Sequence, residues 1–202
     1  MALQECGLNL NREAKELQPH GTIEFPCAGY TSYHIEREED IIPWHWHDEI
    51  EFVYMAEGKM KVKTPSESYI LEKGDMVAIN SNILHYASAV GKCRLRSLVF
   101  SPMLITGNDN SVYAKKYIQP LVSCNSFSSL FIDTENENVS VWFNAAFEAL
   151  SHDTRGFEFT VRENLSRICF YLYGQFEQQF FQKEKSLNQD NLRIRQMLKF
   201  IQ

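Results

Sequence analysis

Residues 44–51, with the sequence WHWHDEIE, bring together side chains that can bind ligands or metal ions. His45, His47 and Glu51 are separated by even numbers of residues, so on an extended strand their side chains point to the same face. A paired strand could place His85 opposite them, and three imidazoles and one carboxylate would then converge. Such a set suits a borderline divalent ion such as Zn, Mn, Fe or Ni, with coordination positions left open for water or a ligand.

An interpretation without a metal ion stays open for the same residues. Inside a barrel, these four side chains can form the polar floor of a pocket and hydrogen-bond an organic ligand directly. His34, on a strand predicted over residues 31–36, is a fifth candidate for ligand binding because it could line the same barrel mouth. The sequence therefore predicts one site that binds a small molecule, a metal ion, or both.

The residues between the candidate ligands are expected to have other roles. Trp44 and Trp46 have the opposite parity to the histidines, so we expect them to pack on the outer face of the sheet. Glu49 shares the parity of His47 and would face the cavity, unless a bulge after the histidines turns it outward. The pattern leaves the direction of Glu49 open.

The elements that must position these residues are short strands. Before Ser101, apolar and polar residues alternate, as in residues 59–63, where Met60 and Val62 face one side and three lysines face the other. Turn signals at residues 57–59, 73–75 and 80–82 interrupt this pattern. Strands are predicted over residues 31–36, 49–56, 59–64, 68–71, 76–79 and 94–100. Many short strands in close succession predict a sandwich or a barrel.

Beyond residue 102 the apolar period becomes helical. The spacing predicts helices over residues 139–150 and 157–181, and a shorter one over residues 111–119 that is expected to stop at Pro120. The longest helix has an apolar surface wider than one stripe, so we expect a homodimer through residues 157–181. A charged replacement of Leu172 or Phe176 should then weaken the dimer, whereas unfolding would mean that the helix is core.

Composition limits the classes of protein that the chain can represent. Its 202 residues, 44% of them hydrophobic, can bury one good core, and the net charge of −6 argues against direct binding to DNA phosphates. The five cysteines are widely spaced and odd in number, which argues against a disulfide framework and favours the cytoplasm. The sequence has no signal-like start and no run of 18 apolar residues, so we expect neither export nor a membrane span.

The spacing of the histidines, acidic residues and glycines resembles a known family. The first cupin motif is matched throughout by the series His45-x-His47-x3-Glu51-x6-Gly58. The second cupin motif is partly matched by the series Gly74-x5-Asn80-x-Asn82-x2-His85. Asn80 and Asn82 stand where cupins usually have Pro and Gly. Together with the strand YILEKGDMVAINSNILH and the tail NLRIRQMLKFIQ, the order of these motifs resembles the N-terminal regulatory half of AraC-family transcription regulators, over residues from about 20 to 202.

This resemblance implies a mainly β fold with helices, in which a cupin-like double-stranded β-helix, or jelly-roll, barrel precedes C-terminal dimerisation helices. The implied organisation is an N-terminal arm (1–20), the barrel (21–105), a helical dimerisation region (106–181), and a linker with the start of the first helix of a truncated helix-turn-helix domain (182–202). The arm is expected to be frayed in the free state, and in this family such an arm can close over a ligand.

The function implied by the resemblance is effector sensing. A small molecule such as a sugar would bind in the barrel and control DNA binding by a C-terminal domain outside this chain. The chain is then expected not to be an enzyme. Two alternatives stay open: a metal-dependent cupin enzyme of the dioxygenase or isomerase type, and a purely structural dimerisation domain with a filled barrel. The pattern does not identify the effector.

Overall fold

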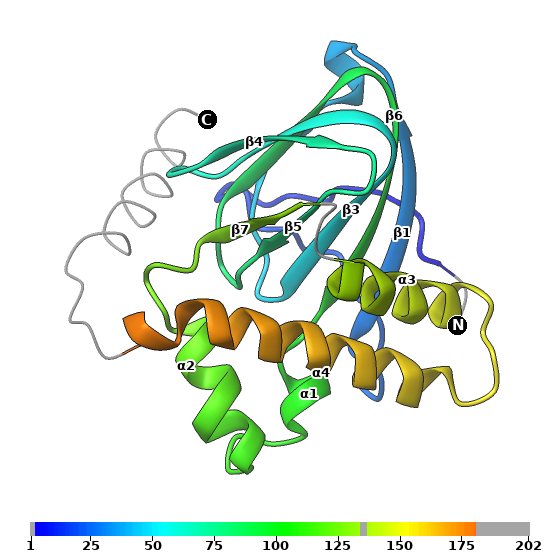
Figure 1. Ribbon diagram of the computed structural model, residues 1–202. Helices are drawn as coiled ribbons and strands as arrows, with labels where there is room; N and C mark the ends of the chain where they lie inside the picture. Colours follow the sequence, from blue (N-terminus) through cyan, green and yellow to red (C-terminus); the bar gives the residue numbers. More distant parts are fainter. Residues whose placement is uncertain (1–2, 134–136, 181–202) are drawn as a thin grey trace.

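The computed structural model describes residues 3–133 and 137–180, and within these residues seven antiparallel strands form a barrel (Figure 1). The strands are β1 (Cys27–His34), β2 (Ile42–His45), β3 (Ile50–Lys63), β4 (Ser68–Glu72), β5 (Met76–Ile79), β6 (His85–Phe100) and β7 (Ser129–Ile132). The helices are α1 (Met103–Thr106), α2 (Gln119–Val122), α3 (Glu137–Ser151) and α4 (Phe157–Phe176). The predicted mainly β fold with helices is therefore confirmed, but the barrel does not end at residue 105, because β7 follows α1 and α2 in the sequence and pairs with β5.

The two long strands β3 and β6 hold the barrel together because each takes part in both of its walls. The first half of β3 pairs with β5 and with the end of β6, and its second half pairs with β4 and with the start of β6. Strand β1 adds to the end of β6, and β2 adds to its start. The resulting wall order, β1-β6-β3-β5-β7, leaves β2 and β4 to complete the other wall.

The predicted turn at residues 57–59 is instead an irregularity within one continuous strand. The register between β3 and β6 shifts on both sides of Glu57, as in a β-bulge. Gly58 has φ +75, and a Cβ at this position would lie 2.1 Å from the carbonyl oxygen of Lys92. Only glycine fits both this backbone conformation and this close approach, which explains why the motif contains it.

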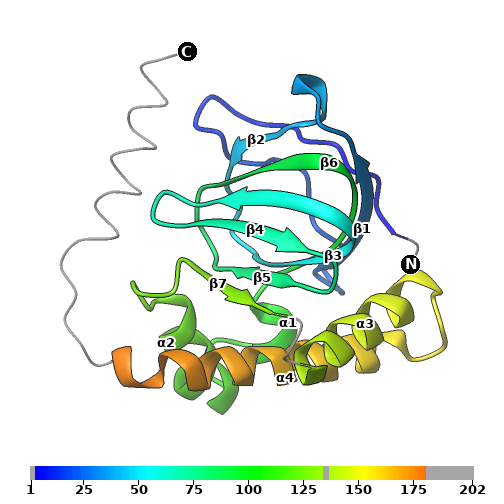
Figure 2. The same ribbon diagram turned by 45° about the horizontal axis from the view of Figure 1, so that its top comes forward.

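The helices gather on one side of the barrel, with α4 running along it (Figure 2). They bury the side chains of one face of the wall β1-β6-β3-β5-β7, including Phe52, Leu98 and Phe100, all 0% exposed. Phe143 from α3 and Leu165 from α4 complete this core. Because side chains alternate along each strand, the side chains on the opposite face of the same wall point into the barrel.

The predicted helices over residues 139–150 and 157–181 correspond to α3 and α4. The predicted stop at Pro120 is wrong, because a π-helical turn at Tyr113–Ile118 runs directly into α2, where Pro120 lies in the first turn. Leu172 is 0% exposed within the protomer, so a charge at this position would disrupt the core rather than report on a dimer.

The N-terminal segment 3–20 is packed on the barrel rather than frayed. Backbone hydrogen bonds join Glu16 N to Trp46 O at 2.9 Å and Trp46 N to Ala14 O at 3.0 Å. The indole Nε1 of Trp46 donates to the carbonyl oxygen of Glu13 at 2.9 Å, and Gln4 N donates to Gly29 O at 3.0 Å. This segment therefore packs against the barrel and lines part of its interior, although its sequence has few large aliphatic residues.

Residues 181–202, which include the predicted linker and the start of a helix-turn-helix domain, lie outside the described residues. Within the described ranges, none of the helices combines the length and the apolar character that crossing a bilayer requires.

Candidate ligand site in the barrel

The barrel contains a cavity of about 340 Å³, which is within the range of small-molecule binding pockets. Its wall is mostly apolar and includes Val53, Met60, Val62, Ile79, Leu95 and Val99. Its polar part contains all of the residues proposed from the sequence as candidate ligands: His34, His45, His47, Glu51 and His85. The cavity can therefore receive a molecule with both a polar and an apolar part.

Strand pairing explains why distant parts of the sequence meet at this site. His45, the last residue of β2, is the direct cross-strand partner of His85, the first residue of β6, and their ring centroids are 4.0 Å apart. Glu51 in β3 pairs with Val99 of β6 and Ile79 of β5, which places it on the inner face of the wall. The predicted opposition of His85 to the first motif is therefore observed.

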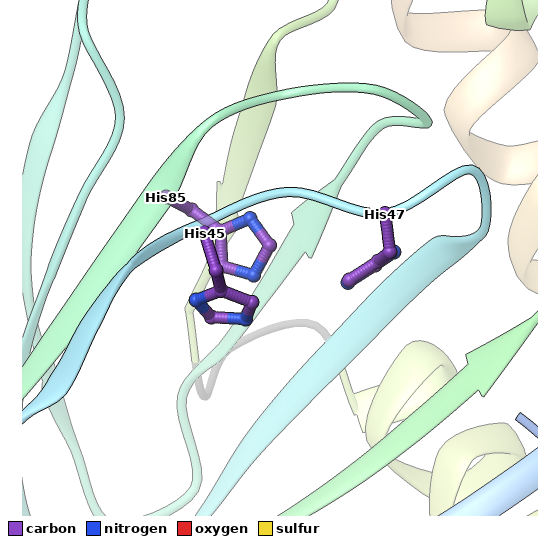
Figure 3. Close-up of side chains that lie close together, drawn as sticks. All are labelled: His45, His47 and His85. Carbon is purple, nitrogen blue, oxygen red and sulfur yellow. The ribbon is translucent and has the colours of Figure 1, made fainter. Parts of the chain in front are cut away.

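His47 comes from a loop rather than from the extended strand assumed for residues 45–51, because β2 ends at His45 and β3 begins at Ile50. The carbonyl oxygen of His47 accepts a hydrogen bond from Asn82 N at 2.8 Å, which ties this loop to the one that precedes β6. Its ring lies across from those of His45 and His85 (Figure 3). Two loops and three strands together thus build the site.

The asparagines of the second motif have identifiable structural roles. Asn82 has φ +63, a left-handed conformation that asparagine tolerates better than most residues, so it can occupy a position where cupins usually have glycine. The buried side-chain amide of Asn80 donates to the carbonyl oxygens of Val122 and Phe127. Both departures from the motif are therefore compatible with the loop that positions His85.

Hydrogen bonds to the backbone fix the tautomers of two of the histidines. Nδ1 of His45 lies 2.8 Å from Pro43 O, and Nδ1 of His85 lies 2.9 Å from Ile83 O. Carbonyl oxygens only accept hydrogen bonds, so both Nδ1 atoms carry the proton and donate it. In the neutral rings, Nε2 then holds a lone pair, which is the usual arrangement of histidines that bind a metal ion.

Electron-rich atoms of the site, the Nε2 atoms of His47 and His85 and the carboxylate of Glu51, lie next to one another. Nε2 of His85 lies 3.1 Å from Oε2 of Glu51 and Nε2 of His47 lies 3.6 Å from the same oxygen, yet Nε2 of His85 is buried with no hydrogen-bond partner. Two electron-rich atoms at this distance repel unless a cation, either a proton or a metal ion, lies between them. The arrangement is therefore incomplete without a positive charge.

The electrostatic environment supports this interpretation. Burial, with His85 beside it, lowers the pKa of His45 to about 3, so this ring is neutral at ordinary pH. Burial alone would raise the pKa of Glu51, but the adjacent His47 and His85 hold it well below its ordinary value. A neutral imidazole next to an ionised carboxylate is the form in which both can bind a divalent ion.

A metal ion fits the residues that are present. The candidate ligand atoms of His45, His47 and His85 all lie within 4.8 Å of one another, and Glu51 is adjacent to two of the three rings. Three imidazole nitrogens and one carboxylate oxygen are a donor set that Zn, Mn, Fe and Ni accept. These four residues are therefore the ones that would hold such an ion.

The other candidates lie apart from this set. His34 lines the cavity, but Nδ1 donates to Asp40 O at 3.0 Å and Nε2 accepts from the Ser32 hydroxyl at 2.8 Å, so both nitrogens are satisfied. Trp44 and Trp46 do not line this cavity; Trp46 is covered by the N-terminal segment. Glu49 does not line the cavity either, but its Oε2 lies 3.7 Å from Nδ1 of His47.

Sequence reasoning missed the contribution of the N-terminal segment to the cavity. Glu16 and His20 line the cavity, and both side chains are largely buried. The signal that could have found them is the spacing of four residues between Glu16 and His20, in a region where the apolar residues show little periodicity. That spacing alone is common on protein surfaces, so it did not distinguish these residues.

Comparison with known proteins identifies the family. The family model described as an AraC-like ligand binding domain matches residues 29–168, which is most of the chain. The chain belongs to the AraC-like ligand binding domain family. The resemblance stated from the motifs is thereby confirmed, and the matched region spans the barrel as well as most of α4.

A curated relative and two solved structures are also similar to this AraC-like domain. An HTH-type transcriptional regulator of Bacillus subtilis (strain 168), YdeC, is 31% identical over 125 residues, which are 61% of this chain and 42% of that protein. The chain thus spans less than half of this relative. The crystal structure of unsaturated fatty acid bound ToxT from Vibrio cholerae has a TM-score of 0.54 at 10% identity, covering 74% of this chain and 55% of ToxT. Apo ToxT K231A from the same organism gives a TM-score of 0.53 at 12% identity, covering 84% of this chain and 62% of that one, so the two share the fold.

Proposed function

We propose that this AraC-like domain is the effector-sensing and dimerisation module of an HTH-type transcription regulator. The observation that carries the proposal is the cavity itself, where the buried Nε2 of His85 faces Glu51 and the buried Nδ1 of His47 faces Glu49, and neither nitrogen has a hydrogen-bond partner. Unsatisfied buried polar groups are costly, so a site that keeps them is suited to a ligand that completes them. DNA binding would belong to a separate C-terminal domain, and such a regulator would act in the cytoplasm.

The shape of the cavity favours an effector with one polar end and a compact apolar part. The polar end would lie against the four candidate ligands, and the remainder would contact the apolar wall that includes Val53, Leu95 and Val99. A carboxylate or a hydroxyl group could bind there directly or through a divalent ion held by His45, His47, Glu51 and His85. When bound, such an ion supplies a Lewis acid that holds an oxygen atom of the effector. Sugars and short carboxylic acids are the two chemical classes to compare.

A screen of thermal unfolding tests this assignment. The 202-residue chain is mixed with sugars, monocarboxylic acids and long-chain fatty acids, each with and without Zn²⁺, and compounds that raise the midpoint are titrated by calorimetry. His85→Ala should weaken the binding of a true effector by about 1–3 kcal/mol for each lost hydrogen bond. His152→Ala, at an exposed histidine outside the cavity, should not change it. An effector that binds the His85 variant as tightly as the unmodified chain would refute the site.

Dimerisation is the second part of the proposal. Phe159 and Phe170 on α4 are 82% and 64% exposed, and their separation of 11 residues places them on the same side of the helix. Phe170 also contacts Tyr117 and Tyr173, which extends this apolar surface. Exposed aromatic clusters of this kind are typical of interfaces, and a second copy of the chain is the proposed partner.

Light scattering tests the dimer at high micromolar concentration. The unmodified chain should have the mass of a dimer, and Phe170→Asp should shift it to a monomer without changing the circular dichroism spectrum. Arg155→Asp, at an exposed residue between α3 and α4, is a control for the change in charge. A monomeric unmodified chain would refute this part of the proposal and leave the ligand site unaffected.

An enzyme is the alternative, because the complete set of three histidines and one glutamate is also the ligand set of metal-dependent cupin enzymes such as dioxygenases and isomerases. An enzyme converts its substrate into a product, whereas an effector-sensing domain only binds its ligand. A protein loaded with Fe, Mn, Ni or Zn that converts a small substrate, and loses this activity in His45→Ala, would establish the alternative.

A further inference from the structure

A second cluster of potential metal ligands lies where the N-terminal segment meets the barrel. His20 from this segment is 8% exposed, and its ring centroid lies 5.3 Å from that of His47. One ligand atom each of His20, His47 and Glu49 lies within 4.8 Å of the others. We call the set formed by His45, His47, Glu51 and His85 the inner site. His47 is the one residue that belongs to both clusters.

Hydrogen bonds fix the tautomer of His20 as they do for the inner histidines. Nδ1 of His20 lies 2.8 Å from the hydroxyl oxygen of Tyr30, and this hydroxyl donates its proton to Oε1 of Gln4 at 2.8 Å. Since the hydroxyl has only one proton to give, Nδ1 must be the donor in the first contact. Nε2 of the neutral ring then carries a lone pair, and it is buried with no hydrogen-bond partner.

Carboxylates face this lone pair and the second nitrogen of His47. Oε2 of Glu16 lies 3.4 Å from Nε2 of His20, and Oε2 of Glu49 lies 3.7 Å from Nδ1 of His47. Nδ1 of His47 is also buried without a hydrogen-bond partner. The cluster thus has two orphaned nitrogen atoms and two carboxylates, the same kind of incompleteness as the inner site.

The position of His47 between two carboxylates allows it to serve either site. Its Nε2 lies 3.6 Å from Oε2 of Glu51, and its Nδ1 lies 3.7 Å from Oε2 of Glu49. A neutral imidazole has one lone pair, so it can bind a metal ion through one nitrogen while the other donates a proton. Whichever nitrogen binds the ion, the remaining N–H faces a carboxylate that can orient the ring.

We propose that His20, His47 and Glu49, with Glu16 beside them, form a second divalent-cation site at the junction of the N-terminal segment and the barrel. Two imidazole nitrogens with carboxylate oxygens suit Zn²⁺ and similar ions. The two sites share His47, so an ion at one position competes with an ion at the other. Because His20 and Glu16 belong to the N-terminal segment, an ion in the second site ties this segment to the barrel. The proposal does not depend on whether the cavity binds an organic effector.

Zinc binding by a chain that lacks the inner site provides the test. The double variant His45→Ala/His85→Ala keeps every ligand of the second site and should bind one Zn²⁺ per chain in equilibrium dialysis with metal analysis. Adding His20→Gln should weaken this binding at least tenfold. Adding His34→Gln, at a cavity histidine whose nitrogens are both satisfied, should leave it unchanged.

Two further measurements keep the test decisive. If His20→Gln alters the fold, as seen by circular dichroism, Glu49→Gln replaces it, since this side chain is 25% exposed and its loss is less disruptive. Zn²⁺ should also slow tryptic cleavage after Arg12 and Lys15 in the double variant, and this protection should disappear with Glu49→Gln. A double variant that keeps its circular dichroism spectrum and binds no Zn²⁺ would overturn the proposal. Zinc binding that survives both replacements would likewise overturn the proposal.

Discussion

The two faces of the wall β1-β6-β3-β5-β7 differ in chemistry although they belong to the same strands. Toward the helices, Phe52 and Leu98 are fully buried among apolar side chains. Toward the barrel interior, Glu51, Val53 and Ser97 line a cavity. Because side chains alternate along a strand, one wall can serve a dry core on one side and a polar pocket on the other.

The difference between the faces separates stability from ligand binding. The helix-facing side carries large apolar residues, whose burial is the main favourable contribution to folding. On the cavity side, buried ring nitrogens of His20, His47 and His85 have no hydrogen-bond partner. Sites of function often retain such unfavourable arrangements, because a ligand rather than the fold completes them.

The largest effect on stability is expected on the helix-facing side. Phe52→Ala should lower the free energy of unfolding by about 3–5 kcal/mol, because it removes a fully buried ring and leaves a void in a packed core. Urea denaturation followed by circular dichroism measures this loss. Val53→Ala, on the next residue of the strand, should cost only about 1–2 kcal/mol because its side chain already borders the cavity. Equal losses for the two variants would remove the distinction between the faces.

The next largest effect is expected where the two walls meet. Gly58→Ala should lower the free energy of unfolding by at least about 2 kcal/mol, because φ +75 is unfavourable for alanine and its Cβ would collide with Lys92 O. Gly91→Ala is the matched control: Gly91 has a similar φ of +74, but no atom lies within 4 Å of the added Cβ. A control that destabilises as much as Gly58→Ala would show that backbone conformation alone, without the close approach, accounts for the effect.

A smaller effect is expected where the N-terminal segment packs against the barrel. Trp46→Phe removes the hydrogen bond from the indole Nε1 to Glu13 O and should lower the free energy of unfolding by about 1 kcal/mol. The N-terminal segment should then open more often, so that trypsin cleaves after Arg12 or Lys15 several times faster. Trp44→Phe is the control, since the ring of Trp44 contacts Tyr86. Unchanged cleavage in Trp46→Phe would show that other contacts hold this segment.

The motifs predicted the site better than the local pattern predicted the strands. The parity of His45, His47 and Glu51 and the position of His85 identified four residues that do converge. The assumption behind the parity was wrong, because a loop separates β2 from β3. The prediction succeeded because the motif spacing reflects the folded barrel and not a single extended strand.

Other features could not be predicted because they depend on contacts between distant residues. The pattern at Gly58 predicts a turn between two strands, whereas the glycine is required by the approach of Lys92 from another strand. The packing of residues 3–20 depends on backbone hydrogen bonds to Trp46, and no periodic pattern reveals such bonds. His20 therefore became a candidate ligand only through the tertiary structure.

The most direct test of the separation between stability and ligand binding is the free energy of unfolding of Glu51→Gln, measured in metal-free buffer at pH 8. At this pH a neutral imidazole is the ordinary form of histidine, and the amide group of the new glutamine can donate to the lone pair of His85, 3.1 Å away. The attraction that holds the pKa of Glu51 low needs a proton on His47 or His85, so it is lost when both rings are neutral. With neutral rings, the variant should be more stable than the unmodified chain by about 1 kcal/mol, because a repulsive contact becomes a hydrogen bond. A loss of more than about 1 kcal/mol would contradict this account and would show that Glu51 is a structural ion-pair partner instead of part of a ligand site.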